Sequence, residues 1–210
     1  MTNQRYMLAE RFRHLLKKYT DNKGLVGEFW DEIKSQYSSK SRHYHTLVHL
    51  HNMFQELEQV KSEVQNLDVL EFSIFYHDIV YKASRSDNEQ QSAELFKKRL
   101  SKTSFPFIQN CENQILATKK HLTSSDHDTN ILLDLDLSIL GQSQELYTQY
   151  AADIREEYKV YPDFLYNKGR IKVLNHFLGL ESIFKTEHFI ATYERQARRN
   201  LLIELNKLVG

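Results

Sequence analysis

The chain contains few residues that break regular structure, and this feature most constrains what it can fold into. Only two prolines, Pro106 and Pro162, and six glycines interrupt its 210 residues. So few breakers suit long helices joined by short turns. No repeat, low-complexity tract or linker is visible in the sequence. The sequence therefore predicts an all-α protein with a single domain over residues 1–210, a length that one hydrophobic core can serve.

Apolar residues recur at helical spacing along most of the chain. We expect helices around residues 8–16, 25–33, 47–57, 67–75, 86–100, 107–121, 143–159, 163–180 and 187–208. Ser86 and Glu89 resemble a capping box that would open one of them. The segment 133–139 alternates apolar and polar residues, which also fits a strand. We favour a helix, because no partner strand lies nearby, with Gly141 as its C-terminal cap.

Charge and composition exclude some classes of function. Acidic and basic side chains balance at 28 each, which argues against strong binding to nucleic acid. No segment approaches the roughly 20 apolar residues of a membrane span, and the polar start does not resemble a signal peptide. The single cysteine, Cys111, indicates a reducing compartment, so we expect a cytoplasmic protein with no membrane partner. Many aromatic residues expected at the surface make a homo-oligomer plausible, and these include Tyr147, Tyr150, Tyr158 and Tyr161.

Histidines are concentrated in the segment from Arg42 to His51. On a helix, His45 and His49 would share one face, because they lie four residues apart. Imidazole is the commonest side-chain ligand of transition metals. This spacing alone is more often found in surface or polar-core histidines than in ligands.

Two further signals involve carboxylates within apolar surroundings. His77 and Asp78 follow a strongly apolar run, and an ionised carboxylate buried there needs a cation or hydrogen-bond donors. A divalent metal ion would supply the cation; an Arg or Lys partner, or exposure at the helix end, is the alternative. Asp134 and Asp136 lie in a second apolar segment, where the alternative is that they face solvent.

A histidine, an adjacent His-Asp pair roughly thirty residues on and a later aspartate follow one another in order. The stretches that contain these residues, or that follow them as further motifs, are Arg42–Leu50, Phe75–Tyr81, Asp87–Glu89 with Ser92–Ala93, Ala117–Thr118 with His121, Asp134–Leu137 with Ile139–Gly141, Ile154–Tyr158, Gly169–Arg170, and Glu194 with Ala197–Arg198 and Asn200–Leu201. Together they resemble the HD superfamily of metal-dependent phosphohydrolases, in particular a subgroup of bacterial predicted HD-domain phosphohydrolases of about this length. The resemblance covers nearly all of the chain from residue 41 on.

The resemblance implies a compact HD-type helical bundle with a metal ion at its centre, in a core region of about residues 41–141. The implied metal ligands are His45, His77, Asp78 and Asp136. His49 is an alternative first ligand or a ligand of a second metal, and His121 is a further candidate. Asp134 would then orient a ligand or cap the segment.

The function that the resemblance implies is hydrolysis of a phosphate monoester or diester, with nucleotides among the candidate substrates, by a metal-activated water. Mixed histidine and aspartate ligands suit Mn, Fe, Co, Ni or Zn and, with more oxygen ligands, Mg. Asp78 and Arg42 are the expected catalytic residues, Arg42 as a phosphate clamp. The alternatives are an HD-fold di-iron oxygenase, which needs more histidine ligands, and a non-catalytic module that contains a metal and binds a ligand.

Overall fold

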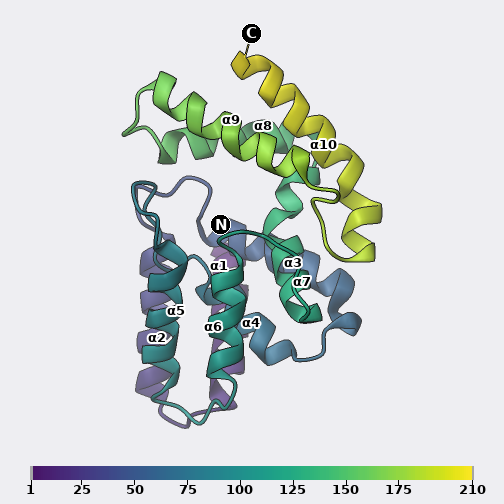
Figure 1. The fold of residues 1–210 in the computed structure, drawn as a ribbon. Helices are drawn as coiled ribbons and strands as arrows, with labels where there is room; N and C mark the ends of the chain where they lie inside the picture. The colour runs from purple at the N-terminus through teal and green to yellow at the C-terminus, as the bar shows by residue number, and fades with distance from the viewer. Residues whose placement is uncertain (1, 210) are drawn as a thin grey trace. The chain divides into compact units, whose positions relative to one another are not determined.

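The protein is helical throughout the part of the chain that the structure describes. The computed structural model describes residues 2–209, with side chains from residue 4 on, and no strand occurs in this range. Ten α-helices, α1 to α10, and two short 3-10 helices, η1 and η2, follow one another along the chain (Figure 1). The all-α prediction is confirmed. None of the helices within residues 2–209 is both long and apolar enough to cross a membrane.

The helices group into two compact units, one up to Leu132 and the other from Leu133 on. The first contains α1 (Thr2–Lys17), α2 (Lys23–Tyr37), α3 (Leu47–Val60), η1 (Lys61–Glu63), α4 (Leu67–Tyr76), α5 (Asn88–Leu100) and α6 (Ile108–Ala117). The second contains η2 (Ser138–Gly141), α8 (Gln144–Glu157), α9 (Asp163–Gly179) and α10 (Glu187–Val209). The division falls within α7 (His127–Leu137). The single domain over residues 1–210 therefore stays a prediction.

Helix α4 forms the centre of the first unit. Its residues from Val69 to Tyr76 are all buried, and α1, α3, α5 and α6 pack against it. Such a helix must be apolar on every side, and its sequence, which carries almost no polar face, agrees with this. At its start, Asn66 accepts a hydrogen bond from the Val69 N–H, and Asp128 accepts the N–H groups of Gln65 and Asn66. These contacts fix where α4 begins, and therefore also where its C-terminal end lies.

An aromatic cluster fills the space around α4. Phe12 of α1 makes edge contacts with Phe72 and Phe75, with ring centroids 6.4 and 5.1 Å apart. Phe96 of α5 lies 5.2 Å from the ring of Tyr76. Edge-to-face pairs contribute about 0.5–1.5 kcal/mol each beyond the burial of their area. The end of α4, which carries the His-Asp pair, is thus held by packing on several sides.

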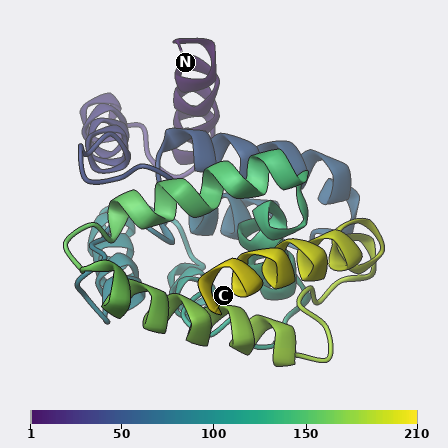
Figure 2. The same ribbon diagram turned by 90° about the horizontal axis from the view of Figure 1, so that it is seen from above.

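In the second unit, α10 lies against α9 and η2 (Figure 2). Asp134, fully buried, accepts hydrogen bonds from the N–H groups of Lys185 and Thr186 and from the Thr186 hydroxyl, at 2.7–3.0 Å. Burial raises the pKa of Asp134 to about 6, although these hydrogen bonds act in the opposite direction. Asp134 therefore holds the turn before α10, a contact that the sequence did not predict.

Several local predictions need correction. The segment 133–139 is helical as expected, but Gly141 is the last residue of η2 and has no positive φ, so it is not a left-handed cap. The capping box at Ser86 is not formed: α5 begins at Asn88, and its N-cap residue Asp87 instead pairs with Arg85 at 2.7 Å.

The tyrosines of the second unit are less exposed than the sequence suggests. Tyr147 is buried and donates a short hydrogen bond to Glu204, while Tyr150, Tyr158 and Tyr161 are half-buried. Exposed aromatic surface on these four residues therefore no longer supports a homo-oligomer.

Candidate metal centre

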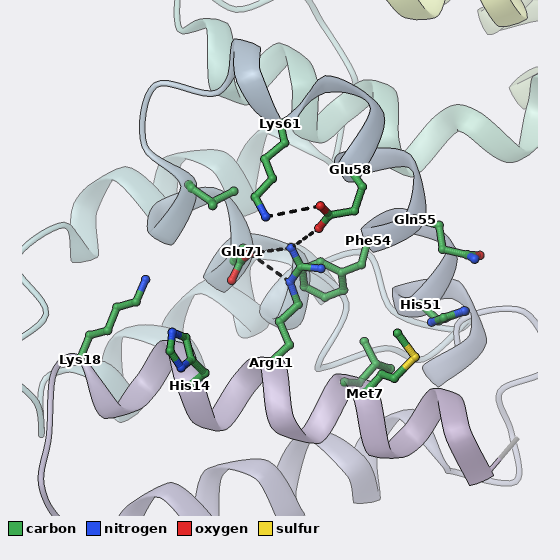
Figure 3. A pocket seen from close by; sticks show the side chains of 12 residues that line it. Met7, Arg11, His14, Lys18, His51, Phe54, Gln55, Glu58, Lys61 and Glu71 are labelled. Carbon is green, nitrogen blue, oxygen red and sulfur yellow. Dashed lines mark hydrogen bonds and ion pairs between the residues drawn. The ribbon is translucent and has the colours of Figure 1, made fainter.

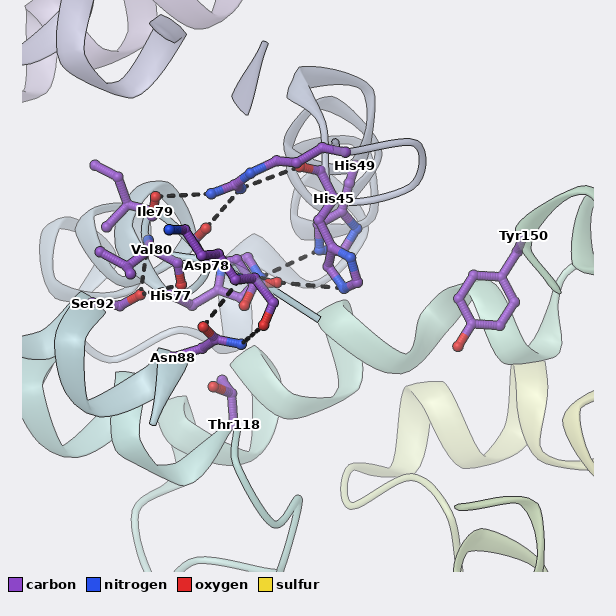
Figure 4. A network of polar contacts seen from close by, with 12 residues as sticks. His45, His49, His77, Asp78, Ile79, Val80, Asn88, Ser92, Thr118 and Tyr150 are labelled. Atoms are coloured by element: carbon purple, nitrogen blue, oxygen red, sulfur yellow. Dashed lines mark hydrogen bonds and ion pairs between the residues drawn. The ribbon is translucent and has the colours of Figure 1, made fainter. Parts of the chain in front are cut away.

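Three imidazoles and one carboxylate converge in the first unit (Figure 4). His49, His77 and Asp78 each offer a ligand atom within 4.8 Å of those of the other two. His45 joins them through Asp78. All four residues are candidate ligands from the sequence, and they come from two segments more than twenty residues apart.

The first segment is the turn that leads into α3. Thr46 is the N-cap residue of α3, and its hydroxyl accepts the Val48 N–H at 3.3 Å. His45 therefore precedes the helix, and the expectation that it shares a helical face with His49 is wrong. The two rings nevertheless lie close, with centroids 5.9 Å apart, because the chain turns sharply at Tyr44, whose carbonyl accepts the Thr46 N–H.

The second segment is the end of α4. His77 is the C-cap residue of this helix and is 1% exposed, while the Asp78 side chain is 14% exposed. The sequence left open whether this pair is buried or exposed at the helix end; the structure buries His77 and leaves Asp78 partly exposed. Of the four side chains, His45 and Asp78 form the accessible edge and His49 and His77 the buried one.

The two distances measured from His77 match the spacing of donor atoms around one metal ion. His77 Nε2 lies 3.3 Å from His49 Nε2 and 3.2 Å from Asp78 Oδ2, and His45 Nε2 lies 3.7 Å from the same oxygen. Bonds of ~2.1 Å from one metal ion place adjacent donors roughly 3.0–3.4 Å apart in octahedral or tetrahedral geometry. The two separations that involve His77 fall in this range. The separation of 3.7 Å between His45 and Asp78 exceeds it, and His45 is not among the residues whose ligand atoms all lie within 4.8 Å of one another.

Hydrogen bonding at His77 determines which of its ring nitrogens faces the other candidate ligands. His77 Nδ1 lies 2.9 Å from the carbonyl oxygen of Ile74, which can only accept, so Nδ1 carries the proton. In the neutral ring, Nε2 then presents a lone pair to the Asp78 carboxylate and to His49. Such an arrangement is unfavourable away from water unless a proton or a metal cation lies between the groups. The same contact, from the second ring nitrogen to a carbonyl, orients most histidine ligands of metals.

Side chains of α5 hold the loop that follows Asp78. The Ser92 hydroxyl bonds both the N–H and the carbonyl of Val80, at 3.1 and 3.3 Å. The buried Asn88 side chain does the same for Lys82, at 3.1 and 3.0 Å (Figure 4). Both residues belong to the stretches that carry the family resemblance, but nothing in their residue types indicated this role from the sequence.

Arg42 does not have the geometry of a phosphate clamp. Its side chain is buried, 6% exposed, and donates to backbone carbonyls: Nη1 to Asp78 at 2.7 Å and to His45 at 3.2 Å, and Nη2 to Ile79 at 2.9 Å. Its guanidinium also lies over the ring of Tyr37, 4.8 Å from the centroid. The catalytic role expected for Arg42 is corrected accordingly. Two other arginines, Arg155 and Arg170, lie in the second unit and form ion pairs with Asp163 and Glu204.

Two further candidate ligands from the sequence are His121 and Asp136. His121 follows α6 and adopts a φ of 50°, the one positive value at a non-glycine residue within the described part of the chain. It is not among the residues grouped around His77. Asp136 is half-buried in α7 and belongs to the second unit. The roles of His121 and Asp136 as metal ligands stay predictions.

Comparison of the chain with protein-family models, with curated proteins and with solved structures gave no match. The resemblance to the HD superfamily therefore rests on the sequence motifs.

Proposed function

We propose that this protein is a metal-dependent phosphohydrolase of the HD type, with His45, His49, His77 and Asp78 as ligands of a divalent metal ion. One observation carries the proposal: imidazole nitrogens and a carboxylate oxygen, from segments far apart in sequence, lie at the spacing of donors around one ion. The order of the HD motifs along the chain supports it independently. Asp136, from the last of these motifs, is proposed as a further ligand on the sequence alone.

The chemistry of the four side chains suits a transition metal. A mixture of imidazole and carboxylate favours Mn²⁺, Fe²⁺, Co²⁺, Ni²⁺ or Zn²⁺ over Ca²⁺. A divalent cation held there supplies Lewis acidity, which lowers the pKa of a water molecule and offsets negative charge on a phosphoryl oxygen.

The chain's own residues have distinct parts in this proposal. His77 is fixed by the Ile74 carbonyl and, with His49, forms the buried wall of the site. Asp78 lies at the accessible edge, so it is also the group best placed to accept a proton from an incoming water. A phosphate ester must approach from the side of His45 and Asp78, because the opposite side is closed.

One observation also favours the oxygenase alternative. Three histidines converge, which is one more imidazole than a single HD set with one first histidine requires. An iron enzyme would show substrate turnover that depends on oxygen, whereas a phosphohydrolase would release phosphate without oxygen. A binding module would contain metal and show neither activity.

The test is metal analysis of the purified protein, followed by a panel of phosphate monoesters and diesters with Mn²⁺, Mg²⁺ or Ni²⁺ added. We expect stoichiometric divalent metal and release of phosphate from at least one class of ester. His49→Gln and Asp78→Asn, which preserve side-chain size, should lose both metal and activity. His176→Gln, an exposed histidine of the second unit, is the matched control and should keep both. Full metal content in both site variants would refute the ligand assignment, and metal without hydrolysis would refute the activity.

A further inference from the structure

We infer that Arg42 is a positioning residue, which sets the spacing of the metal ligands by tying together the two backbone segments that carry them. The inference rests on the proposed metal site and adds a residue that contacts no ligand atom itself. The contacts of the Arg42 side chain carry it.

The guanidinium bridges the two segments through one nitrogen. Its Nη1 donates to the carbonyl of His45 in the turn before α3 and to the carbonyl of Asp78, 36 residues further along the chain from Arg42. Both acceptors belong to residues whose side chains form the cluster. A change of about 1 Å in the distance between these carbonyls therefore changes the distance between His45 Nε2 and Asp78 Oδ2 by a similar amount. Metal sites tolerate deviations of only about 0.2 Å in bond length.

Aromatic rings keep the guanidinium in this position. Its central carbon lies 4.8 Å from the centroid of Tyr37 and 5.6 Å from that of Tyr81. Tyr81 in turn stacks on His45, with centroids 4.0 Å apart and an interplanar angle of 30°. Arg42 thus holds His45 both through its carbonyl and, by way of Tyr81, through its ring.

The loop after Asp78 has two sets of anchors, and Arg42 is the one nearest the ligands. Arg42 holds the carbonyls of Asp78 and Ile79, while Ser92 and Asn88 hold Val80 and Lys82. Loss of Arg42 would leave the far half of the loop attached and would release the half that carries Asp78. The expected consequence is a looser metal site within a folded unit.

Lysine cannot replace this side chain. Arginine presents several N–H groups in a rigid plane, which is what three carbonyls on two segments require, whereas lysine has a single ammonium group on a flexible stem. Arg42→Lys keeps the positive charge and removes the planar set of N–H donors. Arg198→Lys is the matched control, because Arg198 also donates to three backbone carbonyls, those of Leu178, Leu180 and Glu181, but in the second unit.

The experiment compares Co²⁺ binding by wild-type protein, Arg42→Lys and Arg198→Lys. Affinity is measured by calorimetry, coordination by the visible absorption of bound Co²⁺, and folding by the thermal midpoint of the metal-free proteins. Because groups that orient ligands typically change metal affinity 10- to 100-fold, we expect about that loss in Arg42→Lys, together with an altered spectrum. Arg198→Lys should lower the thermal midpoint and leave affinity and spectrum unchanged.

The outcomes separate this inference from the proposed function. If wild-type protein binds no Co²⁺, the metal site itself fails, and the role of Arg42 fails with it. If wild-type protein binds Co²⁺ and Arg42→Lys binds it with the same affinity and spectrum, the role of Arg42 alone is refuted. If Arg42→Lys does not fold, Tyr81→Leu decides, because it removes the ring shared by Arg42 and His45 and keeps the carbonyl contacts. It should weaken Co²⁺ binding several-fold, and unchanged affinity would overturn the inference.

Discussion

Replacement of Gly141 by alanine should destabilise the protein, although alanine is ordinarily the better residue in a helical turn. Gly141 is buried at the end of η2, where α10 passes over it. A Cβ atom at this position would lie 2.8 Å from both Cδ1 and the carbonyl oxygen of Tyr193, and closer still to its Cβ. The backbone oxygen cannot rotate away, so α10 itself must move.

The expected magnitude follows from two opposing effects. Overpacking of a well-packed site costs typically 1–3 kcal/mol, and contact with backbone atoms places Gly141 near the upper end. Alanine also raises the free energy of unfolding by about 0.5–1 kcal/mol, because it lowers the entropy of the unfolded chain. The free energy of unfolding should therefore fall by about 2 kcal/mol, which lowers the thermal midpoint by about 4–8 °C for a chain of this size.

Urea unfolding followed by far-UV circular dichroism measures this change, with Gly169→Ala as the control. Gly169 is exposed in α9, and a Cβ there would meet nothing within 4 Å. The control should be more stable than wild type by about 0.5–1 kcal/mol. If both alanine variants change stability in the same direction, the close approach of α10 to Gly141 is wrong.

Three further predictions concern other parts of the molecule. Cys111 is buried, and burial raises its pKa to about 12, so its alkylation at pH 8 should be slow in native protein and fast in urea. The rate of an exposed thiol in native protein would contradict this. Arg170→Met leaves the mostly buried Glu204 without its bidentate partner, so the free energy of unfolding in urea should fall by about 3–5 kcal/mol. In Arg155→Met the lost partner, Asp163, is exposed, so the free energy of unfolding should fall by less than about 1 kcal/mol. Mn²⁺ at about 100 times its dissociation constant should stabilise the wild type by about 2.7 kcal/mol and leave Asp78→Asn unchanged in a thermal melt; equal shifts in both would place the metal elsewhere.

Helices with one buried face were predictable from the sequence, and the helices of the first unit show this clearly. The apolar spacing from Leu8 to Leu16 and from Leu47 to Leu57 matches α1 and α3. The segment around Asp134 was ambiguous because Ile131 to Leu135 are all buried, so no polar face reveals the helical period. Asp134 contributes to the ambiguity because its carboxylate is satisfied by N–H groups that lie fifty residues further on.

The types of residue and their order along the chain identified the candidate site. The contacts that hold its residues in place could be found only from the fold. The motifs that resemble the HD superfamily implied His45, His77, Asp78 and Asp136 as ligands, with His49 as an alternative. The true partners of Arg42 are backbone carbonyls, which every residue has, so no pattern in the sequence could indicate them. The same reason hides the contacts of Ser92 and Asn88.

One surface feature of the first unit has no assigned role in the proposed function. A cavity of about 480 Å³ lies between α1, α3 and α4, with Arg11 at its centre (Figure 3). Arg11 pairs there with Glu71 at 2.8 Å and Glu58 at 2.7 Å. Three basic side chains, those of Arg11, Lys18 and Lys61, and two acidic ones, those of Glu58 and Glu71, line this cavity.

The most direct test of the metal centre is the anomalous scattering of a crystal grown with Co²⁺, measured at the cobalt absorption edge. The ligand assignment predicts a single strong peak in contact with Nε2 of His45, His49 and His77 and with Oδ2 of Asp78. A peak at any other group of side chains, or none in a crystal with ordered His77 and Asp78, would contradict it.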